Sequence, residues 1–134
     1  MAPFVVRERT PLPPEVAWRR LVDWSAHGRF VPLTRIRVNG TGGVGTVFVA
    51  RTGLGRLGFD DPMEVVAWDP PRHARIEKRG RVVRGWAELT VTPDGDGALV
   101  TWTEEATPRG LPGPVAERLG RRLFRRVVRG LLRG

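Results

Sequence analysis

Cysteine and tyrosine are absent from this chain, and only two of its 134 residues are histidines. The absence of cysteine excludes disulfide bonds, a thiolate nucleophile and cysteine ligands for a metal. His27 and His73 lie too far apart in the sequence for the usual spacing of metal ligands. We therefore expect no metal and no cofactor, and any chemistry would depend on carboxylates, arginines or a histidine.

Long hydrophobic runs are also absent. The uncharged apolar runs are far shorter than the roughly 20 residues that a membrane-crossing helix needs. The first residues lack the basic leader and the apolar stretch of a signal peptide, so we expect a cytoplasmic protein. With 40% hydrophobic and 28% charged residues, the composition predicts one folded domain over residues 1–134.

The net charge of +9 is unevenly distributed along the chain. Residues 113–134 contain seven arginines and one glutamate, a surplus of six positive charges. Lys78 is the only lysine among the 23 basic residues, which is typical of a genome that favours arginine codons. The charge therefore indicates one local basic surface and is weak evidence for nucleic-acid binding.

The order of hydrophobic patterns predicts one strand, two short helices, six further strands and a long C-terminal helix. Residues 4–10 alternate as a strand does, and Pro13 and Pro14 followed by Glu15 are typical of a helix start. The two short helices should extend to about residue 22 and over residues 23–30. The later strands are predicted at Leu33–Val38, Gly45–Thr52, Met63–Trp68, Ala74–Lys78, Val82–Thr92 and Leu99–Ala106. This order favours an α+β fold with an antiparallel sheet.

The predicted C-terminal helix, Val115–Leu132, has two distinct faces at 100° per residue. Its arginines share one face, and the apolar face contains Ala116, Leu119, Gly120, Leu123, Phe124, Val127, Val128 and Leu131. A glycine inside a helix costs about 1 kcal/mol relative to alanine. We therefore expect Gly120 either to pack closely against the sheet or to face a ligand cavity.

The last hairpin indicates which side chains face the interior. If the turn is Asp94-Gly95-Asp96-Gly97, then Leu89 lies opposite Trp102 and Ala87 lies opposite Glu104. Glu104 would then point inward, where it is paired, solvated at the open end of the sheet, or in contact with a ligand. Its neighbour Glu105 should point outward.

The position of Lys78 in its predicted strand would allow its side chain to point toward the inner face of the sheet. An ordinary strand-end lysine in water is the interpretation that we favour.

Two glycine-rich motifs, Gly40–Gly45 and Gly53–Gly58, match G-x-G-x-x-G. Neither precedes a predicted helix, which a dinucleotide-binding loop requires, so both are interpreted as hairpin connections.

Asp60 and Asp61 could form a paired-carboxylate or cation site, but beside Pro62 they are better explained as part of a turn.

Several short segments, in this order and spacing, resemble the START-like helix-grip superfamily (SRPBCC), in particular its bacterial polyketide cyclase/dehydrase or lipid-transport branch. The segments are Asp23-Trp24, His27-Gly28, Val31-Pro32-Leu33-Thr34, Gly45 with Phe48, Asp61 with Met63, Trp68-Asp69-Pro70-Pro71-Arg72, Gly80-Arg81-Val82-Val83-Arg84-Gly85 and Thr101-Trp102-Thr103-Glu104-Glu105. The resemblance covers nearly the whole chain, and it is specific for a fold more than for an activity.

This resemblance implies a seven-stranded curved antiparallel sheet wrapped around the long C-terminal helix, with two short helices after the first strand. It also implies binding of a small hydrophobic molecule, such as a polyketide or lipid, with or without cyclisation and dehydration. The superfamily has no universal catalytic motif, and His27 and Glu104 are the candidates here. The residues expected to contact a ligand are Phe30, Phe48, Ile76, Ala87, Leu89, Trp102, Glu104, Leu119, Gly120, Leu123 and Val127.

The arginine face of the C-terminal helix leaves an alternative function open, which is peripheral binding to anionic lipid or RNA. The helix lacks the interleaved aromatic residues of single-strand binders, so lipid ranks above nucleic acid and a merely solvated face ranks above both. We expect a monomer or a homodimer.

Overall fold

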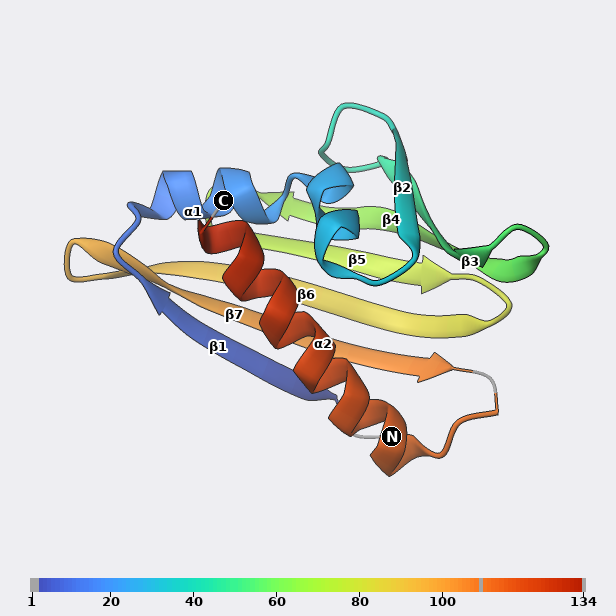
Figure 1. Ribbon diagram of the computed structural model, residues 1–134. Coiled ribbons are helices and arrows are strands. Elements are labelled where there is room, and N and C mark those ends of the chain that lie inside the picture. The colour runs from blue at the N-terminus through green and yellow to red at the C-terminus, as the bar shows by residue number, and fades with distance from the viewer. Residues whose placement is uncertain (1–2, 109, 134) are drawn as a thin grey trace.

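The computed structural model describes residues 3–108 and 110–133. An antiparallel sheet in this part of the chain is covered on one side by two α-helices and one 3₁₀ helix (Figure 1). The elements are β1 (Phe4–Thr10), α1 (Pro14–Leu21), η1 (Trp24–Phe30), β2 (Thr34–Asn39), β3 (Val47–Leu54), β4 (Leu57–Asp69), β5 (His73–Arg79), β6 (Val83–Asp94), β7 (Gly97–Pro108) and α2 (Gly113–Arg133). The predicted α+β order is confirmed.

The sheet has the strand order β1-β7-β6-β5-β4-β3-β2. The first strand pairs with the last one, and α1 and η1 carry the chain across to the opposite edge, where β2 begins a meander back. The predicted register of the final hairpin is confirmed, since Leu89 pairs with Trp102 and Ala87 with Glu104. This register directs alternate residues of β6 and β7 toward the helices.

The short helices begin and pack as the sequence predicts. Pro14 occupies the first turn of α1, where its missing N–H costs nothing, and Glu15 follows it. Ala17, Trp18 and Leu21 bury one face of this helix.

Among the described residues, no helix is both long enough and apolar enough to cross a membrane.

Helix α2 runs diagonally across the sheet and ends beside α1 (Figure 1). Its buried residues are Ala116, Val127, Val128, Leu131 and Leu132. Gly120 is closely packed, because a Cβ at this position would lie 2.5 Å from a ring carbon of Phe4. The glycine therefore admits the Phe4 ring against the helix.

The prediction that Leu119 belongs to the buried face is wrong, since this residue is 53% exposed. Leu119 lies twelve residues before Leu131, which places it about 120° around the helix from the centre of the buried face. The apolar arc predicted from the sequence was therefore too wide.

The strand β4 is longer than predicted, because it begins at Leu57 and not at Met63. Asp60 and Asp61 therefore lie in a strand, and their assignment to a turn is wrong. Pairing with β3 places Pro62 opposite Val49, and Pro62 precedes the first residue of β4 that pairs with β5. A proline at that position removes no hydrogen bond from the β4–β5 ladder.

Candidate ligand cavity

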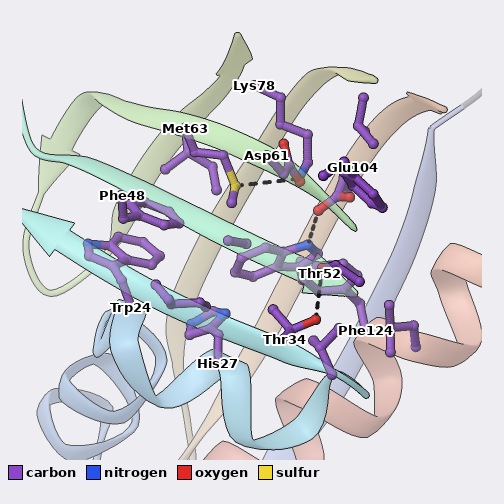
Figure 2. A pocket seen from close by; sticks show the side chains of 18 residues that line it. Trp24, His27, Thr34, Phe48, Thr52, Asp61, Met63, Lys78, Glu104 and Phe124 are labelled. Carbon is purple, nitrogen blue, oxygen red and sulfur yellow. Dashed lines mark hydrogen bonds and ion pairs between the residues drawn. The ribbon is translucent and has the colours of Figure 1, made fainter. Parts of the chain in front are cut away.

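A cavity of about 230 Å³ lies between the concave face of the sheet, η1 and α2 (Figure 2). Strands β2 to β7 each contribute side chains to its wall. Most of the lining is apolar, and the charged side chains of Lys78, Asp61 and Glu104 lie together at one end. The site is therefore a largely apolar cavity with a localised charged group.

Stacked aromatic rings form a large part of the wall. Trp24 stacks on Phe48 with ring centroids 5.0 Å apart, and Trp102 stacks on Phe124 at 5.1 Å. Such flat, rigid surfaces bury much apolar area at little cost in side-chain entropy. The rings are held by elements distant in the sequence, namely η1 with β3 and β7 with α2.

His27 lies between the two tryptophans, with its ring 5.5 Å from Trp24 and 5.7 Å from Trp102. Its Nε2 lies 2.8 Å from the backbone oxygen of Leu21, so in the neutral ring this nitrogen donates the hydrogen bond. Burial is the main cause that lowers the pKa of His27 to about 4. The imidazole is therefore neutral near pH 7, and its hydrogen-bond partner is a backbone oxygen from the preceding helix.

Lys78 is buried, and the prediction that it lies in water is wrong. The residue is 8% exposed, and its Nζ donates to Asp61 Oδ2 at 2.9 Å and to Met63 Sδ at 3.4 Å. The cross-strand register explains this burial, because Lys78 pairs with Met63 in the longer β4 strand. Burial lowers the pKa of Lys78, but the carboxylates of Glu104 and Asp61 outweigh it and hold the pKa above its ordinary value. The ammonium therefore keeps its charge.

Glu104 points inward as predicted and is only 3% exposed. Its Oε1 accepts a hydrogen bond from Trp102 Nε1 at 3.1 Å. Burial raises the pKa of Glu104, and the charge of Lys78 only partly offsets this. Its neighbour Glu105 accepts a hydrogen bond from Trp86 Nε1 at 3.1 Å.

The second carboxylate oxygen of Asp61 has an unusual environment. Among the described residues, Asp61 Oδ1 is the one buried side-chain nitrogen or oxygen that has no hydrogen-bond partner. An unpaired buried acceptor costs roughly 1–3 kcal/mol, and more when it is charged. Asp61 is also one of the residues that line the cavity.

The structure places about half of the predicted ligand-contacting residues around the cavity. Those that line it are Phe48, Ile76, Trp102, Glu104 and Leu123, together with the catalytic candidate His27. Those that lie elsewhere are Phe30, Ala87, Leu89, Leu119, Gly120 and Val127. Ala87, Leu89 and Val127 belong to the solid core, Gly120 is covered by Phe4, and Phe30 packs against Gly130. A ligand contact for any of these residues stays a prediction.

Further lining residues were not predicted from the sequence. They include Trp24, Ala50, Thr52, Phe59, Asp61, Met63 and Phe124. Phe48 was expected from the family resemblance, and the two-residue period of a strand then indicates Ala50 and Thr52 on the same face of β3. Asp61 had no such signal, because its face depends on how β4 pairs with its neighbours.

The arginines of α2 lie on the side away from the cavity. Arg121 pairs with Glu117 at 2.7 Å and Arg129 pairs with Glu8 at 2.8 Å. Exposed arginines on this helix are Arg118, Arg122, Arg125, Arg126, Arg129 and Arg133. Binding of anionic lipid or RNA by this face stays a prediction.

Within the described segments, no cluster of three or more histidine, aspartate or glutamate residues could hold a metal ion.

Comparison with known families gives a match over residues 1–134 to the family described as "Polyketide cyclase / dehydrase and lipid transport". No curated protein sequence matches the chain. Many solved structures share its fold, among them the following three. The protein TTHA0849 from Thermus thermophilus has a TM-score of 0.75 and 18% identity, with 98% of this chain and 94% of that chain covered. The protein Ara h 8.0201 has a TM-score of 0.73 and 16% identity, with 98% of each chain covered. The protein XoxI from Bacillus cereus has a TM-score of 0.73 and 16% identity, with 99% of this chain and 94% of that chain covered.

Proposed function

Because this chain belongs to the polyketide cyclase / dehydrase and lipid transport family, we propose that it binds a small hydrophobic molecule between its sheet and α2. The observation that carries this proposal is the apolar cavity with its two stacked aromatic pairs. Ligand sites are typically concave and mostly apolar, with a few polar groups that orient the ligand. Lys78, Asp61 and Glu104 supply such groups here.

The cavity volume limits the size of the ligand. An apolar cavity of about 150 Å³ binds benzene, so a cavity of about 230 Å³ can take one or two fused rings or a short acyl chain. A full-length lipid or a long polyketide chain would need the sheet and α2 to separate further. The proposal therefore favours a compact ligand, or one part of a longer ligand.

Naphthalene should bind to the purified protein with a stoichiometry of one, as measured by isothermal titration calorimetry and by a raised melting temperature. Ala50→Leu should weaken this binding by about tenfold or more, because the larger side chain occupies the cavity. The matched control is Val49→Leu, since Val49 is the preceding residue of β3 and points to the other face. A wild-type protein that takes up no naphthalene would overturn the proposal.

As a second proposal, we infer that the protein catalyses cyclisation or dehydration of the ligand. The observation that favours it is the buried carboxyl group of Glu104. Loss of water from an aldol product needs a proton for the departing hydroxyl group. A buried carboxyl group with a raised pKa keeps its proton closer to neutral pH than an exposed one does. The neutral imidazole of His27 lines the same cavity and could accept a proton.

Glu104→Gln should slow turnover of a short linear polyketone by about a hundredfold, since one positioned acid contributes about 10²–10⁴ in rate. Product formation would be followed by liquid chromatography and mass spectrometry. Glu105→Gln is the control, because Glu105 is adjacent in β7 and faces the opposite side. If the two variants turn over the substrate equally, Glu104 has no part in the reaction.

A further inference from the structure

We propose that the polar end of this cavity selects neutral ligands that carry a hydroxyl group, such as an alcohol, a phenol or an enol, and rejects carboxylates. This inference rests on the proposal that the cavity binds a hydrophobic ligand. It concerns the ligand's polar group, which Lys78, Asp61 and Glu104 would meet together at one end of the cavity (Figure 2).

The first observation is the unpaired oxygen of Asp61. Oδ2 accepts from Lys78 at 2.9 Å, whereas the buried Oδ1 has no partner in the described chain. A carboxylate oxygen accepts hydrogen bonds and cannot donate them when it is ionised. A ligand group that approaches this oxygen must therefore donate a hydrogen bond, which a ketone or an ether oxygen cannot do.

The second observation is that the bonds of Lys78 are only partly used within the protein. An ammonium group has three N–H donors. Among the described residues, Lys78 donates to two acceptors, which are Asp61 and Met63. A hydroxyl group both donates and accepts, so one ligand oxygen can donate to Asp61 and accept from the remaining N–H. A primary ammonium on the ligand could donate only, and it would lie beside the like charge of Lys78.

The third observation is the local balance of charge. Among the described residues that line the cavity, Lys78 and the neutral His27 are the basic side chains, and Asp61 and Glu104 are the acidic ones. Lys78 is already in an ion pair with Asp61, in which the two side chains are 5% and 13% exposed. A ligand carboxylate would bring a further negative charge beside Asp61 in this buried cluster, where like charges are poorly screened. The pair therefore prevents Lys78 from acting as a free receptor for carboxylates.

Three ligands of similar shape test this selectivity on the wild-type protein. They are 2-naphthol, 2-methylnaphthalene, which replaces the hydroxyl by a methyl group, and 2-naphthoate, which carries a negative charge. In calorimetric titrations at pH 7, 2-naphthol should bind about tenfold to a hundredfold more tightly than 2-methylnaphthalene, as expected for a hydrogen bond to a charged group. Binding of 2-naphthoate should be the weakest of the three.

The double variant Asp61→Leu/Lys78→Met assigns the selectivity to the ion pair. Replacing a buried ion pair by apolar residues of similar volume is often neutral for stability, so this variant should fold. It should bind 2-methylnaphthalene as tightly as the wild type does, or more tightly, and lose the preference for 2-naphthol. Arg75→Gln/Glu88→Gln is the matched control, because it removes an ion pair that joins β5 and β6 outside the cavity.

The possible results separate this inference from the proposed function. If none of the three compounds binds, the proposed function fails. If 2-methylnaphthalene binds as tightly as 2-naphthol, or if 2-naphthoate binds most tightly, the cavity binds ligands but the inferred selectivity is wrong. The comparison of ligands on the wild-type protein decides this even if the double variant does not fold.

Discussion

Lys78→Met should lower the free energy of unfolding by about 3–5 kcal/mol, the usual cost of removing one partner from a buried ion pair. The substitution leaves the aliphatic part of the side chain nearly unchanged but removes the cation from Asp61 and Glu104. Asp61 would then have two buried oxygens without their charged partner, and one of them already lacks a hydrogen bond in the native protein. Urea denaturation at pH 7, followed by circular dichroism, measures the loss.

A second substitution tests the reason for this loss. Asp61→Leu added to Lys78→Met should restore most of the lost stability, because no uncompensated charge of the pair remains. Arg75→Met is the control for the single variant, since Arg75 lies in the same strand and pairs with Glu88 at a partly exposed position. It should cost no more than about 1 kcal/mol through loss of the ion pair. Equal losses of stability in Lys78→Met and Arg75→Met would show that burial of an ion pair does not raise the cost of removing one partner.

His27 should make the protein lose about 3 kcal/mol of stability as the pH falls from about 6.5 to about 4. The pKa of His27 in the folded protein is lowered to about 4, mainly by burial, whereas the ordinary value is 6.5. In this pH range the unfolded chain takes up a proton on His27 before the folded chain does. Stability from this residue is therefore complete above about pH 6.5 and lost progressively as the pH falls to about 4.

The variant His27→Gln isolates this effect from the titration of the carboxyl groups. The glutamine amide can donate to the Leu21 backbone oxygen, as Nε2 does, but does not ionise. Urea denaturation at several pH values should show wild type losing about 3 kcal/mol more than the variant between pH 6.5 and 4. His73→Gln is the comparison variant, since His73 lies at a half-buried position away from the cavity. Parallel curves for the wild type and His27→Gln would contradict the assignment.

The features that depend on short stretches of sequence were predicted correctly. The alternation of β6 and β7 around the Asp94–Gly97 turn sets which residue lies opposite which, so the inward direction of Glu104 followed from that hairpin alone. The consecutive prolines at the start of α1 and the arginine face of α2 are likewise local properties. Local periodicity carries this information because the backbone geometry of a strand or helix determines where successive side chains point.

The character of the cavity depends on residues that are distant in the sequence. Lys78 looked like a solvated strand end and Asp61 like part of a turn, but the pairing of β3, β4 and β5 brings them together inside the sheet. A shift of one residue in that pairing would direct both side chains to the other face.

Gly120 shows the same division between local pattern and packing. Its place on the inner face of α2 follows from the helical period, but Phe4 of β1 occupies the space beside it. The sequence pattern thus identified the sheet, the covering helix and the inward glutamate. Strand pairing and side-chain packing determine where the cavity lies and that a lysine–aspartate pair forms its polar end, because these contacts join segments whose spacing no local period encodes.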